Sequence, residues 1–260
     1  MSRKNASKNQ IIRKDGLNCF MEVINSAFSI GRVIFRFVTY DLKKPVGSRY
    51  TNDVTIYCTF EEFFRISYEL LQSKKLLAQM KQEQLNAQER SKISGKKEYA
   101  YPITLLQGGT SEKALAAKGK SRPDGLAIAR TLKIFPGYKL PIMFRAEQGP
   151  GKSNPTGLIV PVKGAQPEQL VQLGLSMSDC EELFLLTEKH IEAYLSSVYL
   201  MEALHPSEPH YSSSNTDNTN TTTSPNNTFQ PSFTSNTNKN NYPQNPMEDE
   251  NYLSSLLQNS

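Results

Sequence analysis

The stretch that decides the fold is Arg32-Val-Ile-Phe-Arg-Phe-Val-Thr-Tyr-Asp41, in which the side chains alternate in character. One face collects the odd-numbered positions from Val33 to Thr39, and the other collects Arg32, Ile34, Arg36, Val38 and Tyr40. A period of two residues is that of a β-strand. The sequence therefore predicts a strand with one core face and one face that combines cations with a tyrosine.

A second alternating stretch, Val54-Thr-Ile-Tyr-Cys58, runs into a helix-start signal. In Thr59-Phe-Glu-Glu62 the threonine can cap a helix, and the glutamate three residues later can accept a bond from the threonine N–H. We expect a helix that starts at Phe60 and continues beyond Met80. Its apolar stripe comprises Phe63, Ile66, Leu70 and Leu77.

The same order of strand, cap and helix returns in the second half of the chain. Val171-Gln-Leu-Gly-Leu175 alternates, and Ser176-Met-Ser-Asp179 repeats the spacing of the first cap. Aligning the two strands places Ser176 on Thr59 and Asp179 on Glu62. The pattern favours an internal duplication, with coincidence as the alternative because capping boxes are common.

Further strand candidates at residues 18–24, 129–135, 138–146 and 157–162 precede these two helices. They predict an α+β fold of two antiparallel sheets, each closed by a C-terminal helix, in tandem ββββα-like units. The expected organisation is a flexible basic N-terminus (1–15), a first sheet-and-helix unit (16–92), a basic linker (93–128), a second unit (129–205), a disordered linker (206–246) and an acidic, apolar tip (247–260).

Charge is distributed unevenly along the 260 residues, which carry 30 Lys+Arg and 25 Asp+Glu. Residues 206–260 hold one lysine and five acids, a net of −4, so the remaining 29 basic and 20 acidic residues give +9. Residues 211–240 contain 22 Ser, Thr or Asn. The few apolar groups that remain cannot offset the conformational entropy lost on ordering, so we expect this segment to be disordered. A basic body indicates a polyanionic partner, most often nucleic acid, against the alternative of a moderately basic protein without one.

Several classes of protein and of site are excluded by what the chain lacks. It has no run of eighteen apolar residues and no apolar segment after its basic N-terminus, so we expect no membrane partner and a cytoplasmic location. Three single cysteines fit a reducing compartment. The three histidines have no neighbouring cysteine or acid cluster, which predicts no metal, no cofactor and no catalytic site.

Cations and aromatic rings share the outward faces of the expected strands. Single-stranded nucleic acid is bound by this combination, because cations follow the phosphates while rings stack on bases. The alternative is a sheet whose solvated face simply carries polar residues. The candidate nucleic-acid-binding residues are Arg32, Arg36, Tyr40, Tyr57, Lys118, Lys120, Lys133, Phe135, Lys139, Arg145 and Lys152.

The segment Phe28-Ser-Ile-Gly-Arg-Val-Ile-Phe-Arg-Phe37 resembles the opening of the transcriptional positive-cofactor-four family, and the tandem layout resembles the plant Whirly proteins. The resemblance implies strongly curved sheets, single-stranded-DNA binding by basic and aromatic strand residues, and dimerisation. By it Arg32, Arg36 and Tyr40 are DNA contacts, and the helix from Phe60 is a dimer-type packing helix. Assembly of the chain into a homo-oligomer is therefore one of the expectations left open.

The C-terminal tip resembles the acidic, apolar tip of bacterial single-stranded-DNA-binding proteins. That resemblance implies docking of replication or transfer proteins, and its three acids are expected to compete weakly for the DNA-binding face. The candidate partner-binding residues are Glu248, Asp249, Glu250, Tyr252, Leu253, Leu256 and Leu257.

The function expected from the sequence is non-enzymatic binding of single-stranded DNA, in DNA replication or in the transfer of a mobile element. RNA stays open as a ligand. The alternative is a double-stranded-DNA-binding transcriptional regulator or conjugation accessory protein that uses its helices for groove reading or partner docking. A scaffold protein that binds no nucleic acid is a third reading.

Overall fold

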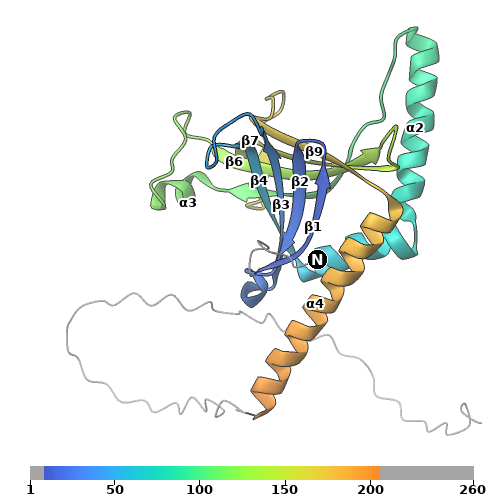
Figure 1. Cartoon of the computed structure of the whole chain (residues 1–260). Helices are drawn as coiled ribbons and strands as arrows, with labels where there is room; N and C mark the ends of the chain where they lie inside the picture. The colour runs from blue at the N-terminus through green and yellow to red at the C-terminus, as the bar shows by residue number, and fades with distance from the viewer. Residues whose placement is uncertain (1–8, 205–260) are drawn as a thin grey trace, which may run out of the picture. The chain divides into compact units, whose positions relative to one another are not determined.

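The computed structural model describes residues 9–204 (Figure 1). Residues 1–8, the predicted linker at 206–246 and the predicted tip at 247–260 lie outside the described residues, and with them all seven candidate partner-binding residues. The described part consists of nine strands and four α-helices, which belong to one structural unit.

The first four strands form an antiparallel sheet, sheet A, in the order β1-β2-β3-β4. Its strands are β1 (Gln10–Gly16), β2 (Cys19–Ile24), β3 (Arg32–Tyr40) and β4 (Tyr50–Thr59), with a short turn of 3-10 helix, η1 (Phe28–Ile30), before β3. Strand β3 is confirmed, and Val33, Phe35 and Phe37 of its predicted core face are buried. The expected contrast between its two faces is only partial, because Ile34 and Val38 of the predicted outward face are buried as well. Strand β1 occupies part of the segment expected to be flexible, because Ile11 and Ile12 are buried against the sheet.

The connection between the two sheets is helical. The capping box is confirmed: the Glu62 N–H donates to Thr59 Oγ1 at 3.2 Å, and the Thr59 N–H donates to the Glu62 carboxylate at 2.9 Å. The helix α1 (Phe60–Ser67) passes into a π-helical turn, η2 (Tyr68–Gln72), before α2 (Lys75–Ser94). The expectation of one helix through Met80 is wrong, because Lys74 takes a left-handed φ of 54° that redirects the chain.

The second sheet, sheet B, contains the remaining five strands, with β5-β6-β7-β8 in order and β9 paired to β7. Its elements are β5 (Ile103–Thr110), α3 (Glu112–Ala117), β6 (Ala127–Pro136), β7 (Ile142–Ser153), β8 (Ile159–Pro161) and β9 (Gln169–Leu175). Strand β5 and helix α3 lie in the segment 93–128 that was expected to be a linker, because Leu105, Leu106 and Leu115 are buried there.

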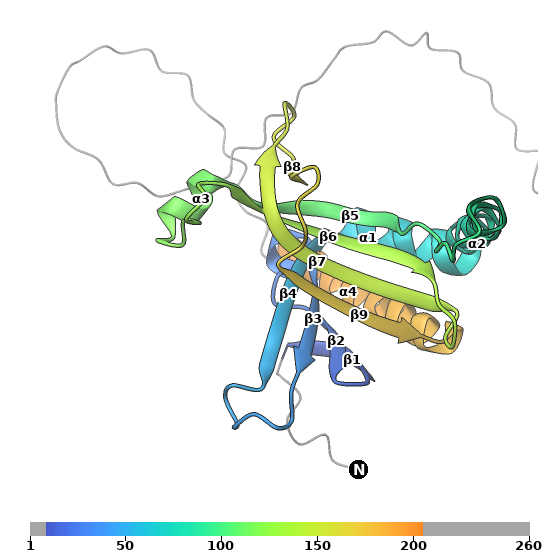
Figure 2. The same cartoon turned by 90° about the horizontal axis from the view of Figure 1, so that it is seen from above.

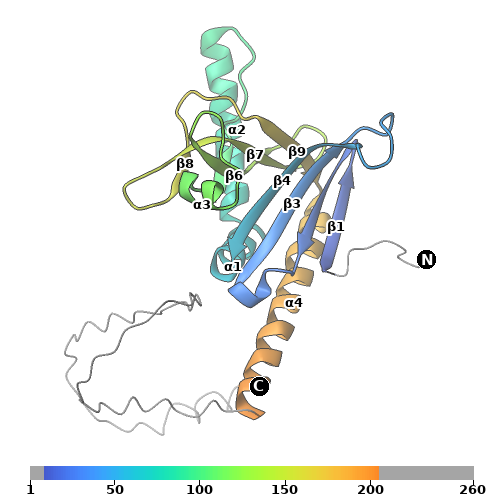
Figure 3. The same ribbon diagram turned by 90° about the vertical axis from the view of Figure 1, so that its left-hand side faces the viewer.

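Helix α4 (Met177–Leu204) follows sheet B as α1 follows sheet A, and it packs on β9 of sheet B and on β1 of sheet A. The second capping box is also confirmed, since the Asp179 N–H donates to Ser176 Oγ at 3.1 Å and the Ser176 N–H donates to the Asp179 carboxylate at 3.2 Å. Figure 3 shows α4 passing beside β1 of the other sheet. The predicted fold class, α+β with two antiparallel sheets each followed by a capped helix, is confirmed.

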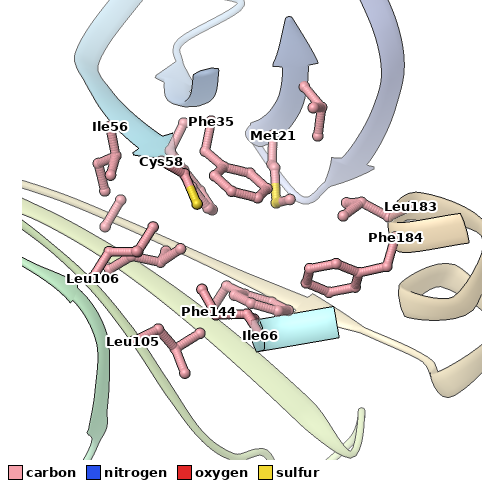
Figure 4. Close-up of a cluster of buried hydrophobic side chains, with 14 of the residues drawn as sticks. Met21, Phe35, Ile56, Cys58, Ile66, Leu105, Leu106, Phe144, Leu183 and Phe184 are labelled. Atoms are coloured by element: carbon pink, nitrogen blue, oxygen red, sulfur yellow. The ribbon is translucent and has the colours of Figure 1, made fainter. Parts of the chain in front are cut away.

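Both sheets contribute to one hydrophobic core (Figure 4). Phe35 of β3 stacks on Phe63 of α1 with ring centroids 6.0 Å apart, and Phe63 lies 5.3 Å from Phe184 of α4. Phe144 of β7 lines the opposite side of the same core. Figure 2 shows the strands of the two sheets crossing at a steep angle above α4. The two halves predicted from the sequence therefore share their buried surface.

Candidate nucleic-acid interface

The outer face of sheet A, the side turned away from the shared core, carries most of the predicted residues of the first half. Along β3 and β4 the register pairs Tyr40 with Tyr50 at one end and Arg32 with Thr59 at the other. Strand β3 has nine residues, so these ends lie about 26 Å apart at ~3.3 Å per residue. The face is therefore long enough to contact several nucleotides of an extended strand.

One end of this face is a shallow hollow that we call the aromatic depression. Its floor is Phe20, whose ring centroid lies 6.2 Å from that of Tyr40 and 5.9 Å from that of Tyr50. Phe20 is buried, whereas 55% of Tyr50 is exposed. The Arg13 guanidinium carbon lies 3.7 Å above the Phe20 ring, and Arg49 lines the same hollow of about 540 Å³. Asp15 pairs with Arg13 at 2.6 Å, whereas Arg49 forms no ion pair within residues 9–204. Rings and guanidinium groups thus share this hollow, with one of the two cations partly offset.

Arg36 lies in the middle of the outer face and has a structural role there. It donates to Asp53 at 2.6 Å and to Glu22 at 3.1 Å, and Glu22 is only 6% exposed. The hydrogen bonds to Asp53 raise the pKa of the Arg36 guanidinium further above its usual range. Two carboxylates therefore surround the cation that we predicted at the centre of the binding face, and the three groups together carry one negative charge.

At the far end of the face lie Arg32 and Tyr57, both exposed as predicted. They line a cleft of about 320 Å³ where β4 of sheet A meets β5, β6 and the β8 region of sheet B. We call this hollow the intersheet cleft. Arg130 of β6 lines it as well. Two arginines and a tyrosine that are distant in sequence therefore converge on one opening.

Sheet B gathers four of the predicted residues at a second location. Lys133, Phe135 and Arg145 share its outer face, and the Arg145 guanidinium carbon lies 4.9 Å from the Phe135 ring centroid. Glu147 accepts from Lys133 at 2.6 Å and lies 3.7 Å from Arg145. Lys139 joins Phe135 in an apolar groove that runs between the β6–β7 turn and α2. One carboxylate thus offsets much of the positive charge on this face.

The other predicted lysines lie at the periphery of sheet B. Lys118 and Lys120 are exposed in the turn after α3, which Figure 2 places at the opposite end of β5 from α2. Lys152 is exposed near the end of β7, where it pairs with Val160 of β8. The predicted residues therefore fall in four places rather than on one continuous surface.

Four residues of the aromatic depression are missing from the sequence prediction: Arg13, Phe20, Arg49 and Tyr50. Phe20 and Glu22 are two residues apart in β2, and this spacing is the signal that they share a face. Arg49 and Tyr50 lie before the alternating stretch that starts at Val54, and the position of Tyr50 depends on the register of β4 against β3. Arg130 lies on the same face of β6 as the buried Leu132 and Ile134. A charged residue on a face that is otherwise apolar was the sequence signal that could have identified it.

The described residues contain no group of three or more His, Cys, Asp or Glu side chains placed to hold a metal ion. Cys19, Cys58 and Cys180 are free and buried, and burial raises the pKa of the Cys180 thiol to about 12. No protein-family model, curated protein or solved structure matches this chain. Within residues 9–204, no helix has the length and apolar character needed to cross a membrane.

Proposed function

We propose that this protein binds single-stranded DNA, without catalysis, through the outer face of sheet A. The observation that carries the proposal is the aromatic depression, in which Tyr40 and Tyr50 flank a buried phenylalanine beside Arg13 and Arg49. Ring faces and guanidinium groups within one hollow are what an unpaired base and its phosphates require. A duplex would not present its bases to these rings, because they are stacked inside the helix.

The binding mechanism has two parts with different signatures. Arginine contacts to phosphates release counterions, so the logarithm of the affinity falls with the logarithm of salt concentration by about 0.7 per phosphate. Stacking on a ring contributes about 1–3 kcal/mol per base and tolerates any base. The proposed activity therefore combines strong salt dependence with little sequence preference, as expected of a protein that acts in DNA replication or in transfer of a mobile element.

The direct test is fluorescence anisotropy of the full chain with a labelled oligothymidylate and with a duplex of equal length, across a salt series. We expect tighter binding of the single strand at every salt concentration and a negative salt slope for both ligands. Equal affinity for duplex and single strand would favour the alternative of a double-stranded-DNA-binding protein that uses its helices. The absence of binding at low salt would favour a scaffold protein that binds no nucleic acid.

A further inference from the structure

The intersheet cleft contains a cation, Arg130, that forms no ion pair with a carboxylate within residues 9–204. Arg130 Nε donates to Gln148 at 2.7 Å and Nη1 donates to Thr110 at 3.1 Å, so both of its protein partners are neutral. A guanidinium has five N–H donors, and within residues 9–204 no hydrogen bond or ion pair is made by Nη2. Burial lowers the pKa of this arginine, whereas the nearby Tyr57 opposes that shift.

Such a half-buried cation without a carboxylate is costly, because burial removes water without supplying an opposite charge. The other charged groups that line the cleft are Arg32 and Glu62. The Glu62 carboxylate is held by the N–H and hydroxyl of Thr59 in the capping box. Arg32 is exposed and forms no ion pair in the described part of the chain. Two cations and one acid therefore line the opening, and within the described residues Glu62 accepts hydrogen bonds from neutral donors of Thr59 and forms no ion pair with either arginine.

The rest of the cleft suits a nucleoside next to an anion. Tyr57 has 49% of its surface exposed, and Leu106, Leu158 and Ile159 supply an apolar wall. A Cβ added at Gly108 would meet no atom within 4 Å, so this part of the wall is open. A volume of about 320 Å³ is at the lower end of small-molecule sites.

We propose that the intersheet cleft binds a nucleotide, with its phosphate between Arg32 and Arg130 and its base or sugar against Tyr57. The inference deepens the proposed function and rests on it for the source of the ligand, because Tyr57 lies on the same face of β4 as the aromatic depression. A strand lying along β3 and β4 would bring a phosphate to this opening. A free nucleotide offers the same chemistry.

The test uses the full chain and two probes, thymidine 5′-monophosphate followed by NMR shift changes and an oligothymidylate followed by anisotropy. We expect Arg130→Gln to weaken at least one probe about tenfold or more, the size of a lost hydrogen bond to a charged group. Arg130→Lys should restore part of the affinity. Displacement of the mononucleotide by the oligonucleotide identifies the strand as the source, and its retention identifies a free nucleotide.

Two variants guard against loss of folding at Arg130. Arg32→Gln removes an exposed cation, and Gly108→Val narrows the cleft while every hydrogen-bond donor stays; both should weaken the same probe several-fold. Normal binding of both probes by all three loss variants would overturn the proposal.

Tyr50→Ala, at the other end of the face, separates the cleft site from the proposed interface. This variant should weaken binding of the oligonucleotide and leave binding of the mononucleotide unaffected. If neither Tyr50→Ala nor Tyr40→Ala affects the oligonucleotide but Arg130→Gln affects the mononucleotide, the cleft site holds and the proposed interface fails.

Discussion

At the scale of single residues, two arginines of β3 with the same predicted role have different environments. Arg32 is exposed and lines the intersheet cleft, whereas Arg36 is held between Glu22 and Asp53. Removing Arg36 leaves the buried Glu22 carboxylate without its cation, and an unsatisfied buried charged group costs about 2–3 kcal/mol. A DNA contact would instead leave stability unchanged.

We therefore expect Arg36→Gln to lower the free energy of unfolding by about 2–3 kcal/mol, measured by urea denaturation. Arg32→Gln on the same strand is the matched control and should change stability little. Adding Glu22→Gln to the Arg36 variant should recover part of the loss, because the stranded charge is removed. An unchanged free energy of unfolding for Arg36→Gln would mean that the ion pairs of Arg36 with Glu22 and Asp53 contribute nothing to the stability of the fold.

At the scale of elements, an ion pair connects the first strand to the last helix. Lys14 of β1 donates to Asp179 of α4 at 2.8 Å and also contacts Glu182. The hydrogen bond from Lys14, followed by that from Ser176, lowers the pKa of Asp179 to about 2. A carboxyl group with a lowered pKa stabilises the fold above its unfolded value near 4, and this contribution disappears as the pH falls toward 2.

The expected outcome is a pH-dependent difference between the wild type and Asp179→Asn. The variant should unfold at lower temperature at pH 7, because it has lost the ion pair to Lys14, and the two proteins should converge between about pH 4 and pH 2. Glu89→Gln, an exposed position without an ion pair in the described residues, is the control. A difference that persists unchanged at pH 2 would argue against the ionised Asp179 as its cause.

At the scale of the molecule, the shared core predicts that the two sheets unfold together. Phe144→Ala in β7 removes a buried ring and should cost about 3–5 kcal/mol. We expect peptides from β3 and from β7 to lose hydrogen-exchange protection at the same urea concentration, and the variant to shift both equally. Leu185→Ala, at an exposed position of α4, is the control. Sheet A peptides that keep their protection would indicate two independent domains.

The fold could be predicted from the sequence where local signals are strong. The prediction failed where the position of a strand depends on its pairing with a strand distant in sequence. Strand β9 and the second half of β4 alternate strictly, β3 is rich in β-branched and aromatic residues, and both capping boxes are local, so each could be found from a few neighbouring residues. Strand β5 was missed because its Gln-Gly-Gly interrupts the alternation, and its position depends on pairing with β6.

The candidate site was predictable to a similar extent. The outward faces of β3 and β6 follow from period two, so Arg32, Tyr40 and Lys133 were found. Alternation contains no information about what lies opposite on another strand, and therefore the neutralising acids Glu22 and Glu147 remained hidden. The same limit concealed the convergence of Arg32 with Arg130, which requires two sheets to meet.

Contact between the aromatic depression and single-stranded DNA is best measured by the oligothymidylate affinity of the Tyr40→Ala/Tyr50→Ala double variant. Tyr199→Ala is the matched control, since Tyr199 is an exposed tyrosine on α4 outside the proposed face. At about 1–3 kcal/mol per stacked base, the double variant should bind at least tenfold more weakly, with its salt slope unchanged because no cation is lost. Wild-type affinity of a folded double variant would contradict the account.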